Sequence, residues 1–217
     1  MMLGWLKSER QKNPFPGDTH LDSVRYVVLD TELTSLDPRS NRVLSIGAIV
    51  MEGPRIRLGE QFYRTVNPGV PIPPDSVLIH QLRSEDLDGA ELPGDVFEDL
   101  LKFVTGSVLV GHFVHFDRKA LWKELGDDRH RLDNPAVDTA RAHHWILRHG
   151  RYSDDLAIQL EQQDLATLAK FYQLDVHDSH HALGDAFLAA QLWQKMLARL
   201  YTHGVHTLRD LLKISQV

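Results

Sequence analysis

Residues 25–32 read RYVVLDTE, and this stretch predicts the central strand of the fold. Residues 26–29 are apolar or aromatic strand formers that end in polar residues, which favours a short buried strand over a helix. Successive strand side chains point to opposite faces, so Asp30 and Glu32 share one face, about 6–7 Å apart along the chain. Two carboxylates at the end of a buried strand are costly unless a cation joins them. A hard divalent ion bound through oxygens would meet that need, although solvated acidic residues also commonly begin loops.

The composition is that of an ordinary globular protein. The chain has 217 residues, of which 42% are hydrophobic and 25% charged, so we expect one large domain with a sizeable core. It has no cysteine, which excludes disulfides, thiolate zinc sites and cysteine nucleophiles. The first residues lack the apolar segment of a secretory signal, and no later stretch approaches membrane-spanning length, so we expect a soluble cytoplasmic protein with no membrane partner.

The net charge limits the kind of nucleic-acid partner. A formal charge of −6 argues against a protein that coats long nucleic-acid tracts, because such proteins normally carry a basic face. It does not exclude an enzyme that grips a few phosphates through metal ions.

The order of elements predicts an α/β fold. Strands at residues 25–32, 43–52 and 57–66 are joined by short connections, which favours an antiparallel meander. Later strands are predicted at 108–111 and 136–137, and helices at 84–87, 95–104, 118–125, 139–148, 165–172 and 182–200. Strands followed by strand–helix units suggest a mixed sheet flanked by helices.

The two ends and one polar segment are set apart in this interpretation. Residues 1–24 are expected to form an extension in which Trp5 and Leu6 could seed a short helix. Residues 150–163 are polar and are expected to form an insertion, loop or helix. Residues 201–217 are expected to form a short tail with one helix.

Two further acidic groups follow in the chain. Asp117 lies in GHFVHFD, after a buried strand and at the start of a predicted helix, where a helix-capping role is the simplest interpretation. Asp185 lies in HHALGD, in the first turns of the long C-terminal helix, where it would also suit the helix dipole. Five residues on a helix correspond to about 500°, so His180 and Asp185 would not share a face if both were helical. We therefore expect His180 on the loop that enters the helix, beside Asp185.

Taken together, these groups resemble the DnaQ-like 3′→5′ exonucleases of the DEDDh class, within the ribonuclease H-like superfamily. The matching stretches are LDTELTSLDP, VLSIGAIV, VNPGVPIPPDSVLIHQL, VGHFVHFDRKAL, VDTARA and LATLAKFYQLDVHDSHHALGDA. The resemblance covers roughly residues 25–200 and extends to the proofreading epsilon subunit of bacterial DNA polymerase III. It implies an exonuclease domain with a five-stranded mixed sheet whose first three strands are antiparallel.

The resemblance also implies a catalytic set. Asp30, Glu32, Asp117 and Asp185 would hold two divalent cations, Mg²⁺ or Mn²⁺, with Asp30 bridging them, and His180 would be the general base. Such a pair of ions can stabilise both the attacking and the leaving oxygen of a phosphoryl displacement, and a neutral imidazole can remove a proton near pH 7. The implied products are nucleoside 5′-monophosphates released from a 3′ end.

Several other positions are implied to bind substrate. Leu36 would pack against the terminal base, His80 would lie near the terminal nucleotide, and backbone N–H groups around Leu33 would bind its sugar. Leu33 replaces a usual threonine. Phe113 replaces a usual asparagine and could substitute stacking for a polar contact.

The resemblance gives one aspartate and one histidine no catalytic role. Asp138 matches an aspartate of the fold that is not a ligand. The His-x-Ala-x-x-Asp spacing selects His180 rather than His181 as the base.

Three alternatives stay open. An exoribonuclease that trims RNA ends or short oligoribonucleotides would use the same residues, because a 2′-hydroxyl contact cannot be read from this sequence. A non-catalytic domain that associates with a polymerase would be expected to lack a carboxylate or the base. A different histidine-metal phosphohydrolase using His177 and Asp178 lacks regular ligand spacing. The expected partners are a single-stranded DNA or RNA 3′ end and, as a further possibility, a DNA polymerase.

Overall fold

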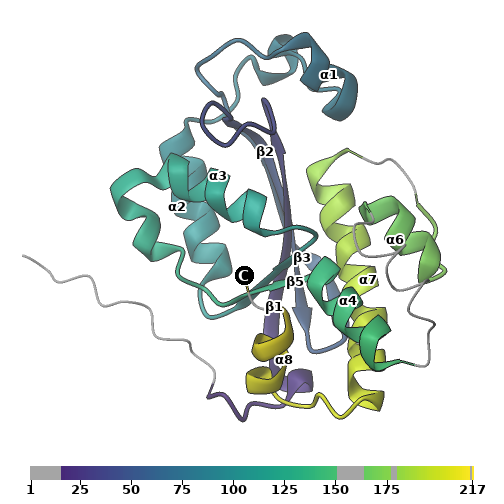
Figure 1. Cartoon of the computed structure of the whole chain (residues 1–217). Coiled ribbons are helices and arrows are strands. Elements are labelled where there is room, and N and C mark those ends of the chain that lie inside the picture. The colour runs from purple at the N-terminus through teal and green to yellow at the C-terminus, as the bar shows by residue number, and fades with distance from the viewer. Residues whose placement is uncertain (1–15, 151–163, 177–179, 216) are drawn as a thin grey trace, which may run out of the picture.

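The computed structural model describes residues 16–150, 164–176, 180–215 and 217, and its centre is one mixed β-sheet (Figure 1). The described strands are β1 (Arg25–Leu33), β2 (Val43–Glu52), β3 (Arg55–Thr65), β4 (Val108–Gly111) and β5 (Ala136–Asp138). They lie in the order β3-β2-β1-β4-β5. The pairs β1–β2 and β2–β3 are antiparallel, whereas β1–β4 and β4–β5 are parallel. The predicted five-stranded mixed sheet is confirmed.

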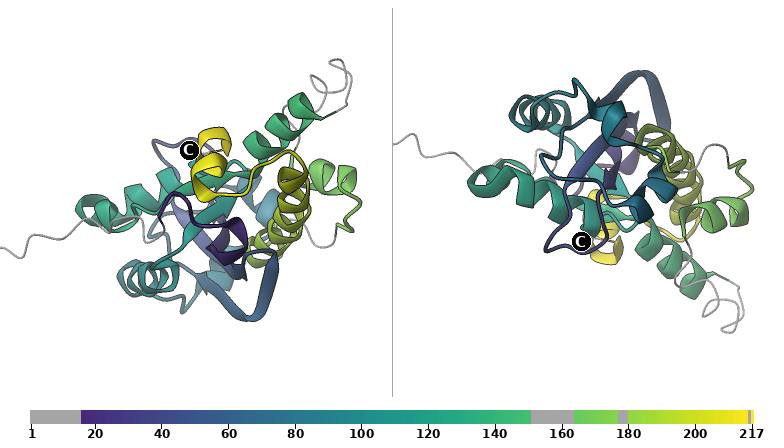
Figure 2. Two further views of the ribbon diagram at one scale, coloured as in Figure 1. Left: turned by 90° about the horizontal axis from the view of Figure 1, so that it is seen from below. Right: turned by 90° about the horizontal axis from the view of Figure 1, so that it is seen from above.

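Helices cover both faces of this sheet, as Figures 1 and 2 show. The described α-helices are α1 (Pro74–His80), α2 (Pro93–Val104), α3 (His115–Leu125), α4 (Thr139–His149), α6 (Leu165–Phe171), α7 (Ala182–Thr202) and α8 (Leu208–Ser215). Short 3₁₀ turns occur at Leu21–Ser23, Ser84–Leu87 and Gly126–Arg131. Helices α2 and α3 lie on one face, and α4, α7 and α8 pack on the other.

The alternation of side chains along β1 separates two hydrophobic cores. Val27 and Leu29 are fully buried in the core that includes α2 and α3. Tyr26 and Val28 are buried in the core formed with α4, α7 and α8. In this core the indole of Trp193 packs edge-on against the ring of Tyr26, with the ring centroids 5.8 Å apart. Each such burial contributes roughly 1.5–3 kcal/mol. Because the alternation continues, Asp30 and Glu32 follow the α7 face and Thr31 follows the α3 face.

The main differences from the sequence prediction are helix α1 and the start of helix α3. Helix α1 was not predicted, because its first residue, Pro74, belongs to a proline-rich segment that reads as a loop. Proline is nevertheless well suited to the first position of a helix, where no N–H is required. Helix α3 begins at His115 and not at Arg118, so Asp117 lies inside its first turn and does not cap it.

The end of the described chain packs against its beginning. Leu208 and Leu211 of α8 are buried in the α7-side core. The N–H of Leu21 donates to the carbonyl of His206, and the N–H of Leu208 donates to the carbonyl of Thr19. The predicted polar insertion at 151–163 and the predicted helix near Trp5 fall outside the described residues. Within the described part of the chain, no helix combines the length and apolar character needed to cross a bilayer.

Candidate active site

Three carboxylates meet at the end of β1. Asp30 and Glu32 of this strand and Asp185 of α7 each offer an oxygen within 4.8 Å of the others. Asp30 and Asp185 are partly exposed, and Glu32 is buried. The period-two prediction for Asp30 and Glu32 therefore agrees with the geometry, and the C-terminal helix brings Asp185 to the same face.

Gly47 allows α7 to approach this face closely. Gly47 pairs with Asp30 in the β1–β2 ladder, and a Cβ built on it would lie 2.2 Å from the backbone carbon of Ala182. No real side chain tolerates that distance, so only glycine leaves room for the first turn of α7. Small buried residues at Ala186 and Ala189 continue the close packing along the helix. Gly47 therefore sets the distance from Asp185 to the end of β1.

Asp117 reaches the site from the opposite face of the sheet. Its Oδ1 accepts hydrogen bonds from the backbone N–H of Thr31 at 2.9 Å and from the hydroxyl of Thr31 at 2.7 Å. Thr31 points to the α3 face, and Asp117 is buried in the first turn of α3. The two bonds fix one oxygen of the carboxylate, and the other, Oδ2, takes no part in this contact.

The four carboxylates destabilise one another's charge. Burial raises the pKa of Asp30 well above its usual value, and the charges of Asp117, Glu32 and Asp185 raise it further. Burial also raises the pKa of Glu32 to about 7, with Asp185 and Asp117 adding to the effect. The pKa of Asp117 rises to about 7 through burial, against the opposing hydrogen bonds from Thr31. In the described part of the chain, no lysine or arginine forms an ion pair with any of the four.

This arrangement fits divalent cations. The donor set is made of oxygens only, as Mg²⁺ and Mn²⁺ prefer. Buried carboxylates that lack a cationic side-chain partner are stabilised by a bound ion, which supplies the missing opposite charge. The side chains available for this purpose are Asp30, Glu32, Asp117 and Asp185.

His180 lies on the loop that enters α7, as predicted. Its backbone N–H donates to Oδ2 of Asp185 at 2.9 Å, and its φ of +70° is in the left-handed region. Burial raises the pKa of Asp185, whereas the N–H and the imidazole of His180 oppose the rise. His180 is thus bonded to Asp185 through its backbone, and the residue is exposed to solvent.

His181, which the motif spacing did not select, makes two contacts of its own. Its Nδ1 accepts from the N–H of Gly184 at 3.4 Å and caps α7. Its ring stacks on Tyr63 of β3, with centroids 4.6 Å apart and planes 24° apart. Sequence reasoning missed Tyr63, because the only available signal was an aromatic residue on a strand whose register was unknown.

The predicted substrate-binding residues differ in exposure. Leu36 is 81% exposed on the loop after β1. At the end of that loop, the guanidinium of Arg42 donates two hydrogen bonds to the carboxylate of Glu124 in α3, at 2.6 and 3.0 Å. Leu33 packs partly against the α3-side core. His80 is only 5% exposed; its Nδ1 accepts from the N–H of Leu82 at 3.0 Å, and burial lowers its pKa.

Phe113 adopts a backbone conformation that suits asparagine better. Its φ is +53°, a region in which asparagine is several-fold enriched and bulky residues are uncommon. Its ring lies 4.4 Å from that of His112. Phe113 lies in the short connection between β4 and α3, the helix that carries Asp117 in its first turn.

Asp138 ends β5 and immediately precedes α4. Asp138 caps α4 by accepting from the N–H groups of Ala140 at 2.9 Å and Arg141 at 3.4 Å, consistent with a residue that is not a ligand. His177 and Asp178, the basis of the alternative histidine-metal interpretation, fall outside the described residues.

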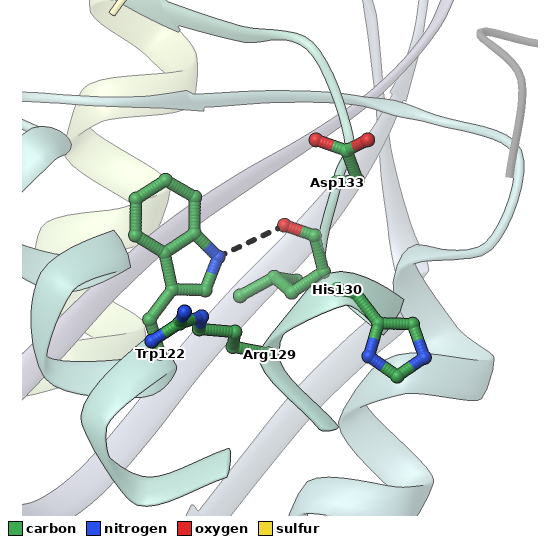
Figure 3. A pocket seen from close by; sticks show the side chains of 5 residues that line it. Trp122, Arg129, His130 and Asp133 are labelled. Carbon is green, nitrogen blue, oxygen red and sulfur yellow. Dashed lines mark hydrogen bonds between the residues drawn. The ribbon is translucent and has the colours of Figure 1, made fainter. Parts of the chain in front are cut away.

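An open surface pocket lies at the other end of α3 (Figure 3). It is lined by Trp122, Arg129, His130, Leu132 and Asp133, and the indole N–H of Trp122 donates to the carbonyl of Leu132 at 3.1 Å. None of the four carboxylates lines it, so the chemistry is better sought at the end of β1.

Sequence comparison identifies similar proteins. Residues 27–193 match the family model RNase_T, described as an exonuclease. The DNA polymerase III subunit epsilon of Rickettsia felis is 31% identical over 185 residues, which cover 81% of this chain and 75% of the relative. The DNA polymerase III PolC-type protein of Lacticaseibacillus paracasei is 30% identical over 197 residues, or 88% of this chain. The chain spans only 12% of the length of that protein.

Solved structures with low identity share the fold. E. coli Exonuclease I in complex with a dT13 oligonucleotide superposes with a TM-score of 0.69 at 16% identity, over 83% of this chain and 42% of that one. Exonuclease X in complex with 5′ overhanging duplex DNA superposes with a TM-score of 0.62 at 21% identity, over 88% and 98%. The ribonuclease H-like fold expected from the sequence is thus confirmed.

Proposed function

The chain belongs to the RNase_T family of exonucleases, and on this premise we propose that it is a metal-dependent 3′→5′ exonuclease that releases nucleoside 5′-monophosphates from DNA. The observation that carries the proposal is the meeting of Asp30, Glu32 and Asp185 within 4.8 Å, with Asp117 held at the same strand end from the other face. Four buried or partly buried carboxylates at one strand end repel one another, and bound cations would offset that repulsion.

The proposed roles follow from the contacts. Asp30, Glu32, Asp117 and Asp185 would hold two divalent cations. When bound, the ions supply charge neutralisation at the phosphodiester and lower the pKa of the attacking water. His180 would accept the proton from that water, since the residue is exposed and its backbone N–H bonds to Asp185. General-base catalysis of this kind contributes about 10²–10⁴-fold.

The surroundings of the cluster favour binding of a frayed 3′ end. Leu36 exposes an apolar side chain that would pack against the terminal base, and Phe113 offers a ring for stacking. His80 is buried and has a lowered pKa, so it would contact the terminal nucleotide as a neutral ring. Backbone N–H groups near Leu33 would bind the terminal sugar.

DNA is the proposed substrate because of the similar proteins. The family relatives include DNA polymerase III subunits, and Exonuclease I, which shares the fold, was solved in complex with a dT13 oligonucleotide. Association with a DNA polymerase is a proposal on the same ground. The exoribonuclease alternative is left to the experiment.

Matched single-stranded DNA and RNA substrates, each labelled at the 5′ or the 3′ end, test the proposal. We expect Mn²⁺-dependent release of mononucleotides from the 3′ end of DNA, and none in EDTA. The Asp30→Ala plus Glu32→Ala double variant should be inactive, and His180→Ala should lose about 10²-fold or more. Full activity of the double variant would refute the metal assignment, and faster digestion of RNA would favour the ribonuclease.

A further inference from the structure

We propose that Tyr63 and His181 form a positioning pair that fixes the backbone at His180 relative to the carboxylates. The inference rests on the proposed function, because positioning matters only if His180 acts as the base. Tyr63 lies on β3, two strands away from Asp30, and neither member of the pair would touch the reacting atoms. The pair is a feature of this chain's own side chains, and the motif spacing gave no indication of it.

The sheet register places Tyr63 on the same row as the site. Tyr63 pairs with Gly47, and Gly47 pairs with Asp30, so the three residues form one line across β3, β2 and β1. Paired residues on neighbouring strands point to the same face. The middle position has no side chain, and the backbone of Ala182 occupies that space. The first turn of α7 therefore lies between Asp30 on one side and Tyr63 on the other.

The two residues that precede α7, His180 and His181, are held by different contacts. The ring of His181 stacks on Tyr63, while the backbone N–H of His180 donates to Asp185. His180 has a positive φ, a strained conformation that persists only where surrounding contacts enforce it. The stack supplies such a contact at the adjacent residue, and the capping bond from Gly184 to His181 supplies a second.

Tyr63 is suited to this role by its surroundings. Its side chain is partly buried, and burial together with the charge of Glu32 raises the pKa of its phenol. A phenol that stays neutral adds no charge to a cluster that already holds four carboxylates.

Variants can separate the ring contact from the cap. His181→Asn keeps a side-chain acceptor for the N–H of Gly184 but removes the ring, and Tyr63→Leu removes the other half of the stack. In Tyr63→Phe the ring is retained. We expect His181→Asn and Tyr63→Leu to lower kcat about tenfold, as for a misplaced general base. Tyr63→Phe should stay within about twofold of the wild type.

A second measurement distinguishes positioning from general damage. Two quantities should change by less than about twofold in all three variants: the steady-state KM for DNA, and the dissociation constant for Mn²⁺ measured by calorimetry. The reason is that the carboxylates are held by other contacts. In the wild type, NMR should show the His181 ring protons displaced upfield by the Tyr63 ring, and Tyr63→Leu should abolish the displacement.

The outcomes are distinct. A wild-type kcat in both His181→Asn and Tyr63→Leu would overturn the positioning role while leaving the proposed function intact. Loss of Mn²⁺ binding in parallel with kcat would overturn it in favour of a purely structural role. Absence of metal-dependent nuclease activity in the wild-type protein would overturn the proposed function and this inference together.

Discussion

Gly47 lies directly opposite Asp30 in the antiparallel β1–β2 ladder, and the backbone of Ala182 occupies the space where a side chain of residue 47 would be. The position of Asp185 relative to Asp30 is therefore set by a residue that has no functional group. A glycine in the interior of a strand is normally a cost in stability. Here glycine is needed because α7 approaches the strand too closely for any side chain at residue 47.

Gly47→Ala should displace the first turn of α7. Overpacking of this kind costs about 1–3 kcal/mol, and a shift of roughly 1 Å at Asp185 is expected to lower kcat about 10²-fold. Urea denaturation and steady-state nuclease assays measure the two effects. Gly59→Ala is the matched control: Gly59 is also on a strand, has no heavy atom within 4 Å of a built Cβ, and should behave as the wild type. Equal activity of the two variants would contradict the role given to Gly47.

Thr31→Val should weaken the hold on Asp117. The substitution keeps the shape and the backbone N–H but removes the hydroxyl that donates to Oδ1. A hydrogen bond to a charged group contributes roughly 1.5–3 kcal/mol, so we expect Mn²⁺ to bind about tenfold or more weakly by calorimetry. Thr31→Ser retains the hydroxyl and should bind nearly as the wild type does. If valine and serine give the same affinity, the hydroxyl does not position Asp117.

Glu32→Gln should stabilise the cation-free protein above neutral pH. The pKa of Glu32 is raised to about 7 by burial, so its stabilising contribution is complete below its usual pKa and is lost as the pH rises through about 7. In EDTA near pH 8 we therefore expect the variant to gain roughly 1–3 kcal/mol in the free energy of unfolding, and near pH 5 to gain much less.

With saturating Mn²⁺ the order should reverse, because the wild type gains more from the ion. Urea titrations at the two pH values, with EDTA or with Mn²⁺, give all four comparisons. A variant that is less stable than the wild type in EDTA at the higher pH would count against electrostatic repulsion in the cluster.

His143 should make the fold sensitive to acid. It is 1% exposed, its Nδ1 lies 3.1 Å from the hydroxyl of Tyr172, and burial lowers its pKa to about 4. A histidine whose pKa is lowered by folding contributes stability at pH values above its usual pKa of about 6.5. This contribution is lost as the pH falls towards 4. The wild type should lose up to about 3 kcal/mol more than His143→Phe over this range. His130→Gln, at an exposed position, should follow the wild type, and a parallel decline in all three proteins would rule out His143 as the cause.

Much of the sheet could be predicted because strand periodicity is local. The bounds of β2 and β4 agree with the apolar runs, and the shared face of Asp30 and Glu32 follows from the alternation along β1. Helix α7 and the placement of His180 before it follow from the pattern that ends in Asp185.

The remaining features depend on contacts between distant segments. The start of α3 at His115, and hence the approach of Asp117 from the far face, depends on how β4 pairs with β1. The stack of His181 on Tyr63 depends on the β2–β3 register. Local sequence does not specify these registers. The catalytic roles of the five motif residues stay a prediction, which the assays above test.

The separation of the hydrophobic interior into two layers has a consequence for how the protein unfolds. Asp117 is carried by the layer that contains α3, and Asp185 by the layer that contains α7, so cations bound by both side chains would link the two layers. In the cation-free protein, increasing denaturant should therefore unfold the two layers in separate steps, visible as two transitions in circular dichroism. With saturating Mn²⁺, both layers should unfold in a single cooperative transition.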